Sequence, residues 1–448
     1  MKRTIGLWGA VVTLVGFVIG AGIFLLPGEL AATAGPGVVL SYGIASVIVV
    51  FSCTIAAHIG ATFPFSGASF VYSTRMTAPI CGFLMIWLTI AGVSMAVALV
   101  AHGFAEYFAV LVPGSNRTLV AVLAVLTFGG LNMLGAGASV QAQSLMVILF
   151  MAVLAVFCVV GVARVEADLL VPMAPNGYQP ILMAAVPAFF SYAGFSMIID
   201  IGGEIRNPSR TIPLALLISF LVVWMCYSAV ALAIVGHIPW RELAGNTAPV
   251  ATVAGILFPG WTTNLITWTI LAATATSING LLLGYSRDVY VLARVRLLPE
   301  LIATGSGKSG GTGYSVALLT VTSVAAVLMG ASIAGYATVI SIALLLSQVL
   351  LGVATLRLPG AEPVRRAGAA FELSPAWRRF FAVGLIAFST LFIVIGVLGS
   401  PGSGLLLGLC LLAGSAYYRW RQRVLRARGI DLEAGVRDYI EERVARGD

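Results

Sequence analysis

The chain has 448 residues, of which 60% are hydrophobic and only 9% are charged, and its mean hydropathy is +1.03. Soluble globular domains carry about 25% charged residues, so this composition excludes that class and indicates a multi-pass membrane protein. The net charge of +8 suits a bilayer with anionic headgroups, and we expect no nucleic-acid partner.

Twelve apolar segments are long enough to cross about 30 Å of hydrocarbon as α-helices. They lie at 7–33, 39–62, 80–112, 118–135, 141–164, 181–203, 211–236, 262–290, 314–333, 335–357, 378–399 and 402–418. With the N-terminus inside, only Arg117, Arg164 and Arg241 of the 25 Lys and Arg residues fall on external loops. Because Lys and Arg gather on the cytoplasmic side, we expect both termini in the cytoplasm and the chain in the inner (plasma) membrane.

The first span contains three glycines within seven residues, Gly16, Gly20 and Gly22. Each glycine weakens a helix by about 1 kcal/mol relative to alanine, so the sequence predicts a break at 20–23. Unwound backbone at membrane depth is tolerated where it is buried in protein or lines a cavity. We therefore expect this break to form part of a binding site.

The sixth span repeats this feature, since Gly194 lies 174 residues after Gly20 and also occupies the first span of a five-span set. Paired interruptions predict an inverted repeat with a site between its halves. The predicted units are 1–164 (first repeat, spans 1–5), 165–357 (second repeat, spans 6–10, broken at 191–195), 358–418 (two extra spans) and 419–448 (a cytoplasmic basic tail). N–H groups after Gly22 would bind a carboxylate, and carbonyls at 191–193 would bind an ammonium.

Two sets of polar residues are candidates for gating or coupling. Ser196, Asp200 and Glu204 share one helix face and suit a proton-responsive track, although Asp200 could equally bond to a neighbouring helix. Thr276 and Ser277 in the eighth span could bind Na⁺, but such hydroxyls more often bond to carbonyls of their own helix. The seventh span, 211–236, is apolar and offers no functional candidate.

Four motifs in order resemble the amino acid–polyamine–organocation superfamily of transporters. They lie at 19–27, 63–67, 203–213 and 286–299. The resemblance implies a LeuT-type fold, an all-α 5+5 inverted repeat with two extra helices, and alternating access. It also implies a set of substrate-binding residues: Gly20, Ala21, Gly22, Ile23, Val93, Ser94, Val97, Phe190, Ser191, Ala193, Gly194, Phe195 and Leu281.

The candidate pocket positions include no acidic residue, and Ser196 stands where relatives often have one. The resemblance therefore favours neutral, aliphatic or small amino acids, with a cationic amino acid or polyamine exchanger as the alternative. The region around Ile148 lacks the lysine that some relatives place at the cation position. We expect no enzyme activity, metal or cofactor, with H⁺ coupling possible and Na⁺ coupling less favoured; a membrane enzyme or channel is a distant alternative. A homodimer or an accessory membrane subunit is a possible partner.

Overall fold

The computed structural model describes residues 3, 5–20, 22–62, 74–133, 139–195, 197–200, 202–303, 313–361 and 371–446. Its α-helices are α1 (Leu7–Val18), α2 (Gly22–Ala34), α3 (Val38–Thr62), α5 (Pro79–Leu111), α6 (Arg117–Met133), α7 (Ser139–Ala163), α8 (Tyr178–Phe189), α9 (Met197–Asp200), α10 (Pro208–Val235), α11 (Pro249–Leu257), α12 (Gly260–Arg294), α13 (Gly313–Leu328), α14 (Ile333–Ala361), α15 (Pro375–Gly399), α16 (Pro401–Arg426) and α17 (Leu432–Arg446). Short 3₁₀-helices include η3 (Phe190–Tyr192), η4 (Gly202–Glu204) and η5 (Trp240–Gly245).

Six helical stretches of the described chain are long and apolar enough to cross a membrane: Gly22–Ala61, Pro79–Leu111, Pro208–Val235, Gly260–Arg294, Ile333–Arg357 and Pro375–Gly399. Four shorter apolar helices accompany them: Leu7–Val18, Arg117–Met133, Ile148–Ala163 and Gly313–Leu328. The protein is therefore an all-α, multi-pass membrane protein, as the composition predicts.

The first interrupted helix consists of α1 and α2. Helix α1 ends at Val18, where the N–H of Ile19 donates to Val15 O at 2.7 Å and that of Gly20 donates to Val18 O at 2.9 Å. Helix α2 begins at Gly22. The interruption thus starts at Ile19, and Ile23 already belongs to α2.

The second interrupted helix runs from α8 through η3 to α9. The backbone becomes extended at Ala193, whose ψ is 137°, and Gly194 then adopts φ +114°. Only glycine takes up such a positive φ without steric cost. This explains why a glycine stands here in the sixth span.

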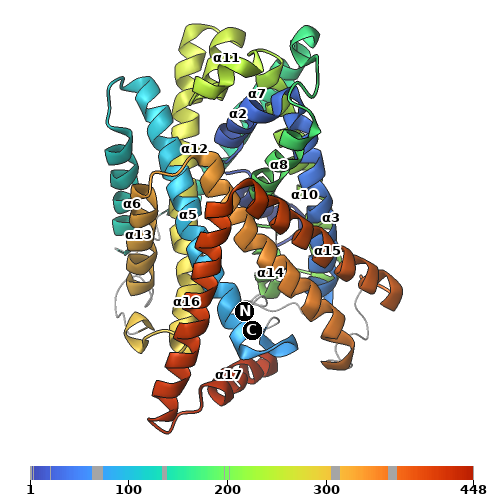
Figure 1. Ribbon diagram of the computed structural model, residues 1–448, viewed down its shortest axis with the longest axis vertical. Helices are drawn as coiled ribbons and strands as arrows, with labels where there is room; N and C mark the ends of the chain where they lie inside the picture. The colour runs from blue at the N-terminus through green and yellow to red at the C-terminus, as the bar shows by residue number, and fades with distance from the viewer. Residues whose placement is uncertain are drawn as a thin grey trace.

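Two groups of packed helices are apparent from the contacts. Helix α10 packs along α1 and α3, and an isolated parallel bridge joins Ile5 to Ile205. In this bridge Ile5 N donates to Glu204 O at 3.0 Å, and Arg206 N donates to Ile5 O at 2.8 Å. The starts of α1 and α10 are therefore tied together. The second group surrounds the long helix α5, which contacts α6, α12, α13 and α14 (Figure 1).

Helix α11 and the 3₁₀-helix η5 lie between the spans predicted at 211–236 and 262–290, where the sequence analysis predicts no helix. Helix α11 has nine residues and packs against α2 and α12. Near the C-terminus, α16 runs on to Arg426, and α17 lies beside the lower end of α16 and below that of α5 (Figure 1). Helix α17 lies within the predicted basic tail, with one side chain in each turn buried against the protein: Leu432, Val436 and Ile440.

Candidate functional site

A cavity of about 120 Å³ lies where the two interrupted helices meet α5, α12 and α14. This volume is several times the ~10–15 Å³ that one water molecule needs, so the cavity has room for a small organic molecule. The lining residues are Gly16, Phe17, Val18, Ile19, Gly20, Gly22, Leu88, Thr89, Gly92, Val93, Ala96, Val100, Phe150, Phe190, Ala193, Tyr227, Thr276, Ser277, Gly280, Leu281, Tyr285, Ile340, Ala343, Leu344 and Ser347.

Two helix ends of opposite polarity border this cavity. The last turn of α1 brings the carbonyl end of one helix to it, while Gly22 opens α2 and brings the N–H end of another. These ends carry about −0.5 and +0.5 of an elementary charge, respectively. The N–H of Ile23 is bonded only weakly, to Gly20 O at 3.5 Å, while its side chain is fully buried. The start of α2 can therefore donate to an anionic group in the cavity.

The two interruptions pack directly against each other. A Cβ built on Gly194 would lie 2.6 Å from Cδ1 of Phe17 and 3.3 Å from Cγ2 of Val18. No side chain fits in that space without moving α1. Gly194 therefore does not line the cavity but allows the break after α8 to approach the end of α1.

Helix α12 closes the cavity on a third side, beside Gly20. A Cβ on Gly20 would lie 3.0 Å from Ser277 Oγ, so this glycine permits close approach of α12. Thr276 and Ser277 both line the cavity, and their hydroxyls donate to Ala273 O at 2.9 and 2.8 Å. Both hydroxyls thus bond to their own helix, which is the alternative to Na⁺ binding given above. A role of these two residues in coupling stays a prediction.

Helix α5 presents Gly92, Val93 and Ala96 to the cavity, whereas two other predicted residues face elsewhere. Ser94 Oγ lies 2.7 Å from Thr322 Oγ1 of α13 and donates to Ile90 O at 2.9 Å. Val97 is fully buried outside the lining. The rotation of α5 thus places Ala96, not Ser94 or Val97, beside Val93 in the wall.

The segment after α8 contributes Phe190 and Ala193 to the lining, but Ser191 and Phe195 are not part of it. Ser191 is buried, and Phe195 is buried with its ring 6.4 Å from that of Phe220. Ala21, Ser196 and the 63–67 motif lie outside the described residues. The side chain of Asp200 does too, and Glu204 lies away from the cavity, in η4, where its carbonyl bonds to Ile5.

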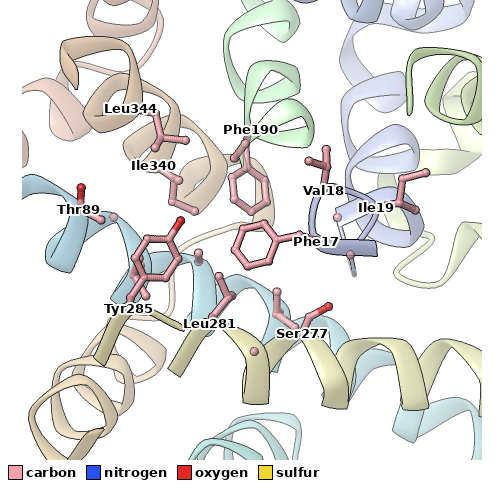
Figure 2. A pocket seen from close by; sticks show the side chains of 18 of the residues that line it. Phe17, Val18, Ile19, Thr89, Phe190, Ser277, Leu281, Tyr285, Ile340 and Leu344 are labelled. Atoms are coloured by element: carbon pink, nitrogen blue, oxygen red, sulfur yellow. The ribbon is translucent and has the colours of Figure 1, made fainter. Parts of the chain in front are cut away.

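Three aromatic residues of the site, Phe17, Tyr227 and Tyr285, were not predicted, whereas Phe190 and Leu281 belong to the predicted set and do line the cavity. Figure 2 shows Phe17 and Phe190 pointing into the cavity from the two interrupted helices, with Tyr285 and Leu281 facing them from α12. The rings of Phe17 and Tyr285 are 6.5 Å apart. From α10, Tyr227 Oη lies 3.3 Å from where a Cβ on Gly22 would stand. The seventh span therefore supplies a polar group to the site, contrary to its featureless sequence.

The chain matches the family model described as amino acid permease over residues 5–408. It belongs to the amino acid permease family. The permease is 27% identical over 319 residues to the branched-chain amino acid permease of Bacillus subtilis (strain 168), covering 67% of this chain and 69% of the relative. It is 26% identical to the methylthioribose transporter of the same organism, covering 68% and 70%, respectively. It is also 26% identical to the vacuolar cationic amino acid transporter 8 of Arabidopsis thaliana, covering 72% and 58%.

The walls of the permease's cavity carry no formal charge among the lining residues that the structure describes. Polar groups come from hydroxyls, on Thr89, Tyr227, Tyr285 and Ser347 besides the α12 pair, and from the helix ends. The remaining side chains are aliphatic or aromatic. The cavity therefore combines two polar helix ends and a few hydroxyl groups with walls that are otherwise apolar.

Proposed function

We propose that this permease carries α-amino acids with uncharged, aliphatic side chains by alternating access. The observation that supports this most directly is the uncharged, largely apolar wall formed by Val93, Ala96, Leu281, Ile340 and Leu344. A charged side chain would lose its hydration there without gaining a partner, at a cost of several kcal/mol. The relatives are named for branched-chain amino acids, methylthioribose and cationic amino acids, so the cavity walls, rather than the relatives, favour the neutral class.

The substrate's backbone groups would be held by the two helix ends. Its carboxylate would accept bonds from the first N–H groups of α2 and from Tyr227 Oη, which lies next to Gly22. Its ammonium would donate to carbonyls at the end of α1 and in η3, near Phe190. The side chain would then extend toward Leu281 and Ile340. This arrangement selects for an α-amino acid whatever its uncharged side chain.

We infer that the chain has twelve spans, arranged as a LeuT-type 5+5 inverted repeat plus two, with both termini cytoplasmic. The paired breaks support this arrangement, and so do the two groups of helices. The bridge between Ile5 and Ile205 holds the start of α1 to the start of α10, so these helices would rock as one body against α5, α6, α12 and α13. Association with a second copy or an accessory membrane subunit stays a prediction.

For energy coupling we propose an exchanger or a proton-linked carrier, with Asp200 and Glu204 as the groups that would respond to protons. Glu204 lies just before α10, where its backbone carbonyl accepts a bond from Ile5 N at 3.0 Å. The described part of the fifth span near the cavity offers Phe150 and no ammonium. Replacement of Asp200 by Asn is expected to flatten the pH dependence of uptake; an unchanged pH profile would return Asp200 to a structural role.

Counterflow in proteoliposomes tests the proposed substrate class. Vesicles preloaded with one unlabelled compound are given a trace of the same compound in labelled form, each compound in turn, with and without a pH or Na⁺ gradient. Valine, isoleucine and leucine are expected to drive accumulation, and lysine, arginine and putrescine are not. Accumulation driven only by the cationic compounds would support the cationic or polyamine exchanger instead. Leakage without counterflow would indicate a channel.

Tyr227 provides a second test, because its hydroxyl is the side-chain donor nearest to Gly22. The Tyr227→Phe variant is expected to raise KM for the transported amino acid about tenfold, since a hydrogen bond to a charged group is worth roughly 1.5–3 kcal/mol. The matched control is Tyr336→Phe, which removes a bond to Ala326 O at 2.7 Å and lies outside the cavity lining. Equal KM values for the two variants would remove Tyr227 from the site.

A further inference from the structure

A second pocket, of about 510 Å³, lies far from the substrate cavity, between the start of α5, the end of α16 and α17. Figure 1 shows α17 lying beside the lower end of α16 and below that of α5. The pocket is lined by Thr74, Arg75, Thr77, Ala78, Pro79, Ile80, Tyr418, Arg419, Gln422, Glu433, Arg437, Ile440 and Glu441. The proposed transport cycle uses none of these residues.

Positive charge from three different segments converges on this pocket. Arg75 precedes α5, Arg419 belongs to α16, and Arg437 belongs to α17. Two carboxylates also line it, Glu433 and Glu441, and Glu433 accepts a bond from Gln422 Nε2 at 3.0 Å. The lining therefore keeps a net positive charge. An arginine group is a planar fork of N–H donors that fits the oxygens of phosphate and carboxylate groups.

The start of α5 adds backbone donors to the same pocket. Ala78 is the extended residue before the helix, and Pro79 occupies its first turn. The 33-residue helix α5 thus directs its N-terminal N–H groups and the positive end of its dipole toward the lining. This favours an anion in the pocket, although a helix end alone would not identify one.

Two buried hydroxyl groups in the lining provide an independent indication of a ligand. Thr74 and Tyr418 are each only 4% exposed. Thr74 Oγ1 and Tyr418 Oη are both buried and have no hydrogen-bond partner among the residues that the structure describes. A buried hydroxyl without a partner costs about 1–3 kcal/mol. Both hydroxyls belong to a pocket that is already positive, so an oxygen-rich anion would satisfy them.

We propose that this pocket binds a phosphate group, either of an anionic lipid headgroup or of a soluble phosphate compound. The phosphate oxygens accept bonds from Arg419, Arg437 and the Thr74 and Tyr418 hydroxyls, and from the start of α5. The ligand thereby links α17 to α5 and α16. The buried side chains of Leu432, Val436 and Ile440 anchor α17 against the rest of the protein. The pocket is therefore formed without the ligand.

Thermal unfolding of the full-length protein in a zwitterionic detergent tests this site, because a ligand that binds only the folded state raises its unfolding temperature. One arm titrates inorganic phosphate and pyrophosphate at constant ionic strength. The other titrates short-chain phosphatidylglycerol against short-chain phosphatidylcholine. A saturable rise with the phosphate salts identifies a soluble source, and a rise with phosphatidylglycerol alone identifies a lipid headgroup.

Three variants locate the effect. Arg437→Gln and Thr74→Val are expected to weaken the apparent affinity about tenfold, since each removes one donor to a charged group. Thr74→Val leaves the charge unchanged, so it separates the site from nonspecific attraction. The matched control is Arg423→Gln, which removes an exposed α16 arginine outside the lining. The proposal is overturned if neither arm shows saturation, or if Arg423→Gln and Arg437→Gln weaken the response equally.

Discussion

Replacing Gly194 by alanine is expected to reduce amino acid uptake to about a tenth or less of the wild-type rate. Alanine at φ +114° costs about 1–2 kcal/mol through its backbone alone. Its Cβ would also stand 2.6 Å from Cδ1 of Phe17, which borders the cavity at the end of α1. Either Phe17 moves into the cavity or the two breaks separate, and both outcomes disturb substrate binding.

Initial rates of labelled amino acid uptake into proteoliposomes measure this effect. The matched control is Gly43→Ala, because a Cβ on this α3 glycine would meet no atom within 4 Å. Gel filtration of both variants in detergent checks that the fold and the amount of inserted protein are unchanged. Uptake at the wild-type rate by Gly194→Ala would show that the close approach of the two breaks is not needed for transport.

The breaks themselves were predictable because glycine has an energetic signature that a sequence displays. Gly20 and Gly194 stand in segments that are otherwise apolar and long enough to be regular helices, so their position marks a local loss of helical structure. The structure adds a distinct reason for each glycine. Gly20 permits the approach of Ser277, whereas Gly194 adopts a backbone conformation that other residues avoid.

The face that α5 turns to the cavity was less predictable, because the rotation of a helix depends on all its neighbours. Spans that are apolar all round lack the one-sided pattern that would fix their orientation. Here the contact between Ser94 and Thr322 of α13 turns Ser94 away and brings Ala96 into the wall. A hydroxyl in an apolar helix needs a partner, but the sequence does not show which helix provides it.

Tyr227 was missed for a related reason, although its sequence context contains a usable signal. It is the one tyrosine in the aliphatic span 211–236, and a buried tyrosine hydroxyl usually has a polar partner. Its neighbours in space, Tyr42 and Tyr192, come from α3 and η3, with ring distances of 5.4 and 6.0 Å, respectively. Only the folded structure brings the three tyrosines together and places the Tyr227 hydroxyl beside Gly22.

Replacing Gly22 by leucine is expected to abolish substrate binding while leaving the protein folded and inserted. The new Cβ would lie 3.3 Å from Tyr227 Oη and 3.5 Å from Cε1 of Phe190, so the rest of the side chain must enter the cavity. There it would cover the first N–H groups of α2, which are the proposed carboxylate donors. The loss should therefore affect every α-amino acid alike, whatever its side chain.

Equilibrium binding of labelled leucine to purified protein measures this prediction directly. Gly130→Leu is the matched control, because Gly130 is an exposed α6 residue whose Cβ would meet nothing within 4 Å. A substitution in the side-chain wall, such as Leu281→Ala, should instead alter the preference among valine, leucine and isoleucine. If Gly22→Leu merely changed that preference, the start of α2 would belong to the side-chain wall, and the carboxylate would have to bind elsewhere in the cavity.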